Sequence, residues 1–372
     1  MKIYIPVNEP KFTPDDKKNL MECIDSGWVS SGGKYLTSFE NKMSTVFRRK
    51  YVSTVTNGTA ALDLAIKSIG IKKNDEILMP SFAIISIVLE VLRVGAKPIF
   101  IDSDPLTWNM NVSDLKKKIT SKTKAIIAVH TYGLPVDMDP IIKFAKKNKI
   151  KIIEDAAEVI GQNYKGRPCG SFGDISTFSF YANKQITTGE GGAILTNRLN
   201  YYKKFKYFRN LCFEKKRFIH RDIGWNLRMT NMQASIGVSQ LNRLSKIIKK
   251  KIDIGKRYNK NLESIDNFLQ LPLAKTSYAV NIYWVYGVVL KKNSKYTALQ
   301  VINYLKKKGI ECRPFFYPLH LQPVVQKLIG KTKTKYPVAE RLSKYGFYLP
   351  SGLALKNKQI DYVSKKLKEL FI

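Results

Sequence analysis

The chain is short of acidic side chains and of cysteine, and it has no long apolar run. Its four cysteines, Cys23, Cys169, Cys212 and Cys312, lie far apart and form no Cys-x-x-Cys pair. Because this spacing indicates neither a disulfide framework nor a zinc site, we expect no bound metal. No stretch reaches the roughly 18 apolar residues that a membrane-spanning helix needs.

The sequence also lacks a recognisable targeting segment. Its most apolar stretch, residues 83–94, is interrupted by Glu90 and Arg93. The first residues include a lysine but not the apolar core of a signal peptide, because Pro6 and Asn8 break the run early. We therefore expect a cytoplasmic protein with no membrane partner.

The shortage of acidic residues leaves a formal net charge of +35, from 64 Lys and Arg against 29 Asp and Glu. Such a charge has two explanations, which are phosphate contacts with nucleic acid or a lysine-rich solvated surface. The lysines form short runs along apparent helices, and no known nucleic-acid-binding motif accompanies them. We favour the solvated surface and keep a non-catalytic nucleic-acid-binding protein as the remote alternative.

Short β-rich runs alternate with amphipathic helical stretches over most of the chain. Thr13 before Pro14 is typical of a helix start, and Gly27 ends that helix. Several strand candidates are almost entirely apolar, as strands covered on both faces are. This alternation predicts an α/β fold with a mainly parallel sheet. The expected strands are residues 52–56, 76–79, 98–102, 125–130, 151–155, 176–180 and 193–196.

The pattern changes past about residue 240. A lysine-rich helical stretch at residues 241–262 leads to a predicted strand at residues 283–290 and a helix at residues 296–308. We therefore expect residues 1–240 to form a large domain. Residues 241–372 are expected to form a connecting helix and a smaller α+β domain.

Three of the predicted strands end in polar segments, at the sheet edge where open α/β proteins bind ligands. Gly58 and Thr59 begin a helix, whose free N–H groups favour a phosphate. Asp155 ends another strand, although an aspartate there commonly caps the next helix. Lys184 lies between two predicted strands, and burying a lysine is costly unless it is paired or used chemically. Taken singly, each residue has a structural alternative.

Taken together, these residues match the needs of pyridoxal phosphate. This cofactor requires a lysine that bonds to it, an acidic partner for its ring nitrogen, and groups that bind its phosphate. Lys184, Asp155 and the helix start at Gly58 and Thr59 can fill these roles. The lysine must lose its proton to act as a nucleophile and as a general base, which burial favours.

Residues 154–197 read EDAAEVIGQNYKGRPCGSFGDISTFSFYANKQITTGEGGAILTN. This run resembles the signature region of the DegT/DnrJ/EryC1/StrS sugar aminotransferases, a fold-type-I family of pyridoxal-phosphate enzymes. The resemblance extends over nearly the whole chain, through residues 25–35, 56–65, 128–141, 224–241 and 313–320. It implies a large domain with a mainly parallel sheet, a smaller C-terminal domain, and a homodimer with active sites at the interface.

The resemblance also implies roles for individual residues. Lys184 looks like the cofactor-bearing lysine, and Asp155 like the partner of the ring nitrogen. Asn226 is similar to an asparagine that reaches the phosphate from the neighbouring subunit. The implied cofactor-binding set is Gly58, Thr59, Asp155, Glu158, Ser179, Lys184 and Asn226. The segments that line the sugar-nucleotide pocket in relatives contain Trp28, Ser30, Ser31, His220, Arg313 and Tyr317, with interface packing an alternative role for Trp28 and Tyr317.

Glu158 bears on the substrate, because many members of the family carry Gln or His at this position. With the Asn183-Lys184 pair, it is similar to a branch that aminates C4 of GDP-4-keto-6-deoxy-D-mannose with L-glutamate as the amino donor. We expect these two substrates, with a UDP- or dTDP-linked 4-keto-6-deoxy sugar as the alternative. In a related dehydratase branch histidine replaces the lysine, so Lys184 favours transamination.

Ile84 departs from the family pattern, since relatives usually place an aromatic residue there, stacked on the cofactor ring. Isoleucine packs by dispersion and forgoes the ~0.5–1.5 kcal/mol that aromatic stacking adds. Either Ile84 makes this weaker contact, or the alignment is shifted and Phe82 supplies the ring.

Overall fold

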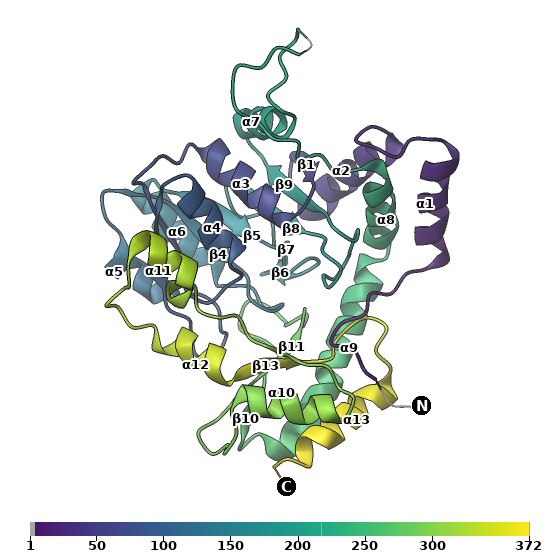
Figure 1. Cartoon of the computed structure of the whole chain (residues 1–372), viewed down its shortest axis with the longest axis vertical. Coiled ribbons are helices and arrows are strands. Elements are labelled where there is room, and N and C mark those ends of the chain that lie inside the picture. The colour runs from purple at the N-terminus through teal and green to yellow at the C-terminus, as the bar shows by residue number, and fades with distance from the viewer. Residues whose placement is uncertain (1–3, 217, 372) are drawn as a thin grey trace.

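The computed structural model describes residues 4–216 and 218–371. A large layered α/β unit lies above a smaller unit, and the long helix α9 (Leu244–Leu262) runs between them (Figure 1). Within the described residues, no helix is both long enough and apolar enough to cross a membrane.

The large unit is built on a seven-stranded sheet with the order β1-β9-β8-β5-β4-β2-β3. Its pairs are parallel except those of β9, which runs antiparallel to both β1 and β8. The fold class is therefore as predicted, and each of the seven strands predicted for the large domain is present within two residues of its expected bounds. The strands are β1 (Tyr51–Val55), β2 (Glu76–Pro80), β3 (Lys97–Ile101), β4 (Thr123–Val129), β5 (Lys151–Asp155), β8 (Ile175–Ser179) and β9 (Gly192–Thr196).

Helices cover both faces of this sheet because alternate strand residues are apolar on both sides. Leu78 and Ile152 point into one core, where they pack with α2 (Lys34–Phe47), α6 (Met138–Asn148) and α8 (Asn231–Asn242). Their neighbours Ile77 and Ile153 point into the opposite core, which is covered by α3 (Gly58–Ile69), α4 (Ser86–Arg93) and α7 (Leu199–Arg209). The sheet is thus the middle layer of three.

The smaller unit has its own core and a four-stranded antiparallel sheet with the order β10-β11-β13-β12. Its strands are β10 (Leu269–Gln270), β11 (Tyr286–Leu290), β12 (Arg313–Pro314) and β13 (Gly346–Leu349). The main helices beside them are α10 (Ala298–Lys307), α12 (Pro337–Tyr345) and α13 (Asn357–Lys368). The domain boundary at residues 240 and 241 stays a prediction.

Local sequence explains where the helices begin and end. The predicted helix after Thr13 is α1 (Pro14–Asp25), and the Thr13 backbone N–H donates to Asp16 over 2.6 Å. The helix expected at residues 241–262 is interrupted, since α8 ends at Asn242 and α9 begins at Leu244. The non-helical φ of −111° at Arg243 separates the two helices.

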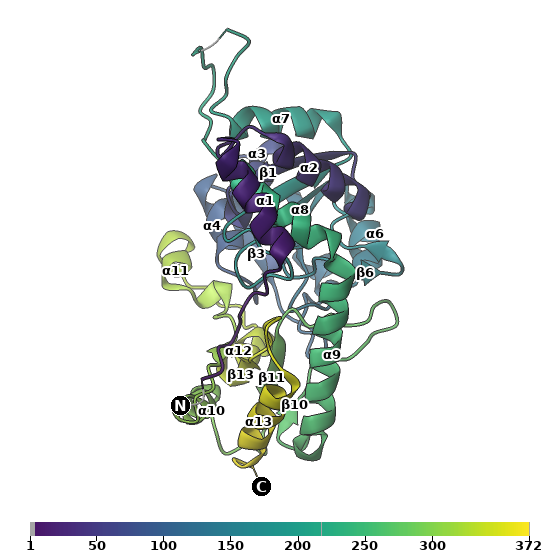
Figure 2. The ribbon, with the colours of Figure 1, turned by 90° about the vertical axis from the view of Figure 1, so that its right-hand side faces the viewer.

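The first described residues form an N-terminal strap, residues 4–9, which lies along the smaller unit (Figures 1 and 2). Ile5 forms an isolated parallel bridge with Ile310, and the Ser351 N–H donates to the Val7 carbonyl over 3.0 Å. The first and the last described residues therefore both lie at the smaller unit, although the larger unit is made from the residues that follow the strap.

One segment leaves the layered body. The chain between α7 and α8 projects beyond the large unit at the top of both views (Figures 1 and 2). His220 and Ile223 lie on it, and the Ile223 side chain is 83% exposed.

Candidate active site

Lys184 lies in the loop after β8, where the two units meet. Its Nζ is 3.6 Å from the centroid of the Trp284 ring, which comes from the segment before β11. The Trp284 Nε1–H donates to the carbonyl of Asn183 over 2.8 Å, and the Asn8 side chain of the N-terminal strap donates to the same oxygen over 3.2 Å. The loop that carries the lysine is thus held by two distant parts of the chain.

Two buried carboxylates stand near this lysine. Asp155 ends β5 and Glu158 follows it, and these residues are 4% and 5% exposed. Burial lowers the pKa of Lys184, and the negative charges of Glu158 and Asp155 oppose that shift. Burial also raises the pKa of both carboxyl groups, against the charge of Lys184. The lysine is therefore closer to its neutral, nucleophilic form than a solvated lysine is.

The hydrogen bonds of Asp155 leave room for a cationic ligand. Its Oδ1 accepts from the Ala157 N–H over 3.0 Å, and among the described residues Oδ2 accepts from no donor. A protonated ring nitrogen could donate a charge-assisted hydrogen bond to this oxygen. The residue thus fits the predicted partner of the pyridine nitrogen.

Gly58 and Ser179 come together from α3 and the end of β8. A Cβ added to Gly58 would lie 2.8 Å from the Cβ of Ser179, so only glycine allows this approach. Asn57 caps α3 by accepting from the Ala60 N–H over 2.9 Å. No described acceptor takes the N–H groups of Gly58 and Thr59, as expected at a helix start. These groups and the Ser179 hydroxyl fit a phosphate.

A buried His130–Glu154 pair beneath the site was missed by sequence reasoning. His130 Nδ1 accepts from the Val136 N–H over 3.2 Å, so the proton lies on Nε2, which donates to Glu154 over 3.1 Å. Burial opposes ionisation of Glu154, but His130 and Arg49 hold the pKa of that carboxyl at about 2. Glu154 directly precedes Asp155, and its charged network fixes the end of β5.

The residues expected in the substrate pocket do not touch this cluster within one subunit, although Arg313 pairs in the β-sheet register with Tyr348, which lies near Glu158. Among the described residues, no hydrogen bond, ion pair or ring contact joins Trp28, Ser30, Ser31, His220, Arg313 or Tyr317 to Lys184, Asp155 or Glu158. Trp28 is 61% and Tyr317 52% exposed. Asn226 is also exposed, and its Oδ1 accepts from Arg228 over 2.9 Å.

Burial distinguishes Phe82 from Ile84 as the residue that could contact the cofactor ring. Phe82 is 0% exposed, and its ring packs against Tyr132, Phe315 and Phe316 at centroid distances of 5.9, 5.8 and 5.8 Å. Ile84 is 41% exposed. The Phe82 ring is therefore committed to the core between the units, which favours Ile84 for a contact with the cofactor.

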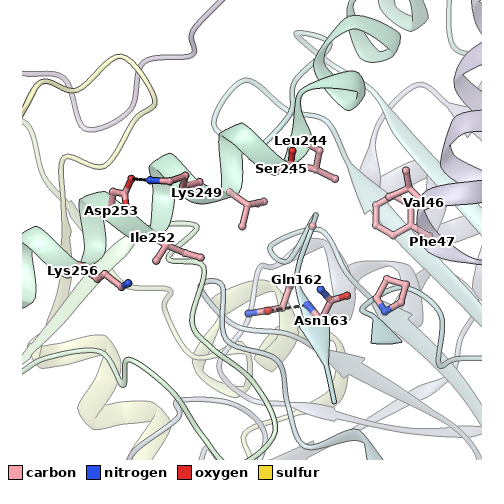
Figure 3. A pocket seen from close by; sticks show the side chains of 13 residues that line it. Val46, Phe47, Gln162, Asn163, Leu244, Ser245, Lys249, Ile252, Asp253 and Lys256 are labelled. Atoms are coloured by element: carbon pink, nitrogen blue, oxygen red, sulfur yellow. Dashed lines mark hydrogen bonds and ion pairs between the residues drawn. The ribbon is translucent and has the colours of Figure 1, made fainter. Parts of the chain in front are cut away.

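A cavity of about 640 Å³ lies elsewhere, between α9 and the hairpin formed by β6 (Asn163–Tyr164) and β7 (Arg167–Pro168) (Figure 3). On its α9 wall, Lys249 and Asp253 form an ion pair of 3.0 Å, and on the other side the Gln162 amide donates to two backbone carbonyls. None of the predicted site residues lines this cavity. Volume alone therefore does not mark the chemical site.

The three-layered fold, with a lysine and an aspartate at the carboxyl edge of its sheet, is that of a fold-type-I transferase. Residues 10–368 match the family model described as the DegT/DnrJ/EryC1/StrS aminotransferase family, and the chain belongs to this family. The predicted family and enzyme class are thereby confirmed. The chain is an aminotransferase with pyridoxal phosphate as its cofactor, in agreement with the residues described above.

Individual relatives agree with this assignment. The chain is 42% identical over 370 residues to GDP-perosamine synthase of Escherichia coli O157:H7, with 99% of each chain covered. It is 38% identical over 369 residues to GDP-perosamine synthase of Vibrio cholerae, again with 99% of each covered. A solved GDP-4-keto-6-deoxymannose-3-dehydratase with a trapped PLP-glutamate geminal diamine superimposes with a TM-score of 0.90 at 25% identity, over 98% of this chain and 100% of that one.

Proposed function

We propose that this chain transfers the amino group of L-glutamate to C4 of GDP-4-keto-6-deoxy-D-mannose and so forms GDP-perosamine. The observation that carries the proposal is Lys184 beside Asp155 and Glu158, in a chain 42% identical over its length to a GDP-perosamine synthase. Glutamate as the donor is supported by the glutamate adduct in the similar dehydratase structure. Lys184 favours amination over dehydration, because the related dehydratase branch carries histidine in place of this lysine.

Residues at the ends of β5 and β8 and at the start of α3 have a role in holding the cofactor. When bound, pyridoxal phosphate supplies an electron-accepting ring that lets an amino group pass from one substrate to the other. The free oxygen of Asp155 would hold the protonated ring nitrogen. The N–H groups of Gly58 and Thr59, with the Ser179 hydroxyl, would hold the phosphate.

Lys184 is the group that moves the proton. Its Nζ takes the proton from the amino-bearing carbon of glutamate and later gives a proton to the sugar carbon that receives the amine. Because burial lowers its pKa, the amine is more readily left unprotonated and able to accept a proton. Trp284 and Asn8 hold the loop through the Asn183 carbonyl and so keep Nζ in place between the two half-reactions.

The substrate pocket is proposed to be completed by a second copy of this chain. Asn226 is exposed and Trp28 is 61% exposed, although the resemblance places both at ligand sites. A homodimer that shares its active sites accounts for residues that are needed for binding but lie away from their own Lys184. The roles of Ser30, Ser31, His220, Arg313 and Tyr317 in this pocket are proposed on the same basis. The cytoplasmic location stays a prediction.

The test is an amination assay with L-glutamate and a panel of GDP-, UDP- and dTDP-linked 4-keto-6-deoxy sugars. We expect 2-oxoglutarate and a 4-amino sugar to form in equal amounts from the GDP-linked mannose derivative. NMR spectroscopy of the product would establish the configuration at C4. Faster turnover of a UDP- or dTDP-linked sugar would contradict the proposed nucleotide, and release of ammonia without a 4-amino product would contradict transamination itself.

A further inference from the structure

A second pocket, of about 490 Å³, lies at the amino-terminal edge of the central sheet, opposite the edge that carries Lys184. We call it the amino-edge pocket. It is formed where α6 ends, where β5 and β8 begin and where β9 ends. Its 15 lining residues include six bases against the single acid Asp174, and the bases are Arg49, Lys146, Lys149, Lys151, Arg167 and Arg198. With 64 Lys and Arg among 372 residues, the basic chain as a whole does not account for this density.

Arg49 is built into the wall of the amino-edge pocket. The residue is 4% exposed, and its guanidinium donates to the carbonyls of Gly170 and Gly173 over 2.9 and 2.6 Å and to the Ser176 hydroxyl over 2.8 Å. Burial lowers the pKa of Arg49 to about 10, so it remains charged at neutral pH. These bonds use Nε and one terminal nitrogen, and Nη1 has no acceptor among the described residues.

Arg167 is also held in place, by Ser171 and Phe172. Its Nε donates to the Ser171 hydroxyl over 2.9 Å, a terminal nitrogen donates to the Ser171 carbonyl, and its guanidinium lies 4.5 Å from the centroid of the Phe172 ring. Because the Arg167 side chain is already ordered, it would lose little conformational entropy when its remaining N–H groups bind a ligand.

Two carboxylates lie close to these bases and leave part of the positive charge unpaired. Glu154, buried behind the wall of the pocket, lies 3.9 Å from Arg49 and pairs with it. Asp174 lies 3.1 Å from Arg198 and 4.0 Å from Lys151, so two of the bases already share it. Lys146 and Lys149 are exposed at the end of α6, and among the described residues neither side chain forms an ion pair or a hydrogen bond. Lysines at a helix C-terminus also favour the helix dipole, and Arg49 pairs with Glu154, but neither role accounts for the ordered Arg167.

We propose that the amino-edge pocket binds a compact anion with two adjacent phosphate groups, either inorganic pyrophosphate or the diphosphate of a nucleotide. Guanidinium groups match phosphate oxygens in a fixed geometry, and the volume lies within the ~300–1,000 Å³ of small-molecule sites. Several bases on different elements suit a ligand with several charged oxygens better than a single carboxylate. The site is separate from the proposed transamination, because none of its lining residues belongs to the proposed cofactor or substrate set, and Arg49 acts on that set only through Glu154.

The test uses isothermal titration of the cofactor-loaded protein with inorganic pyrophosphate. The variant Lys146→Gln with Lys149→Asn removes both unpaired charges, and Asn tolerates the left-handed backbone at Lys149, where φ is 55°. We expect binding to weaken roughly thirtyfold, as for the loss of two charge pairs at about 4 Å in water. Amination activity should not change, which separates this test from that of the proposed function.

Two further variants make the result specific. Lys306→Gln with Lys308→Asn removes the same charges from the end of α10 and should leave pyrophosphate binding unchanged. Asp174→Asn removes the carboxylate but keeps an acceptor for the Ile152 N–H, so it should tighten binding, which local unfolding would not do. Equal affinity for adenosine diphosphate would show that the diphosphate alone is recognised, and tighter binding would identify a nucleotide. An absence of pyrophosphate binding, or equal affinity of wild type and Lys146→Gln with Lys149→Asn, would overturn the proposal.

Discussion

The ammonium nitrogen of Lys184 lies 3.6 Å from the centroid of the Trp284 ring, although these residues belong to different units of the fold. A cation over an aromatic face gains ~0.5–2 kcal/mol, which favours the protonated lysine. Burial favours the neutral amine. The smaller unit therefore contributes to the balance between the two forms of the lysine as well as to the wall of its pocket.

Lys184→Ala is expected to abolish turnover. With no amine to bond the cofactor or to move the proton, the rate should fall by at least about 1000-fold, and the visible absorbance of the lysine-bound cofactor should disappear. Lys251→Met is the matched control, since Lys251 is only 3% exposed but bonds to the Ser351 carbonyl. The Lys251→Met variant should keep both its turnover and the visible absorbance of the bound cofactor. Normal turnover by Lys184→Ala would overturn the assignment of the lysine.

Asp155→Asn tests the partner of the ring nitrogen with little change of structure. Asparagine can still accept from the Ala157 N–H, so the melting temperature should stay close to that of the wild type. The loss of the negative charge should lower the rate on the order of 100-fold or more. Full activity, measured with the cofactor bound, would show that another group holds the nitrogen.

Glu158→Gln should shift a pH profile in a direction set by Lys184. Glutamine retains an acceptor for the Tyr132 N–H but removes a carboxylate that raises the pKa of Lys184. The pKa of the lysine should therefore fall, and the neutral amine should form at lower pH. Because the neutral amine captures the cofactor, the midpoint of the rate of cofactor recombination against pH should move down. An upward or absent shift contradicts this coupling, and the exposed Glu263→Gln serves as the control.

Gly58→Ala should weaken cofactor binding. The new Cβ would lie 2.8 Å from the Cβ of Ser179 and push the start of α3 away from β8. Strain of this kind typically costs ~1–3 kcal/mol, so the dissociation constant should rise roughly 10- to 100-fold. Gly166→Ala is the control, because its φ of 74° also disfavours alanine while the space around it is open. It should reduce stability without changing cofactor affinity.

Hybrid dimers can test whether active sites are shared. Lys184→Ala and Asn226→Ala are each expected to be nearly inactive as homodimers. If Asn226 serves the neighbouring subunit, a hybrid has one site with both native residues, and an equal mixture should recover roughly a quarter of wild-type activity. If Asn226 serves its own subunit, mixing restores nothing. Separately tagged chains and gradient purification would isolate the hybrid for measurement.

Much of the large unit could be predicted from the sequence because its signals are local. Apolar runs identified the strands, and the polar residues at their ends pointed to Asp155, Lys184 and Gly58. The direction of β9 was not predictable, since residues 193–196 are as apolar as a parallel strand. The break at Arg243 was missed for a similar reason, because helical residues continue on both sides of it.

Contacts between distant residues could not be predicted in the same way. Trp284 donates to a carbonyl 101 positions earlier in the chain, and no periodicity connects the two. Trp284 falls within the strand predicted at residues 283–290, but nothing in the sequence points to Asn183 as its partner. Likewise Phe82 and Ile84 were equivalent candidates until their burial separated them.

The N-terminal strap has a consequence for how the protein is made. The Val7 N–H donates to Glu311, 304 positions later, and Asn8 of the same strap supports the loop that carries Lys184. During translation, the large unit can collapse around its sheet before Glu311 and Ser351, to which the strap bonds, have been made. The loop that carries Lys184 is thus braced by a segment that is translated long before Glu311, the residue that holds this segment.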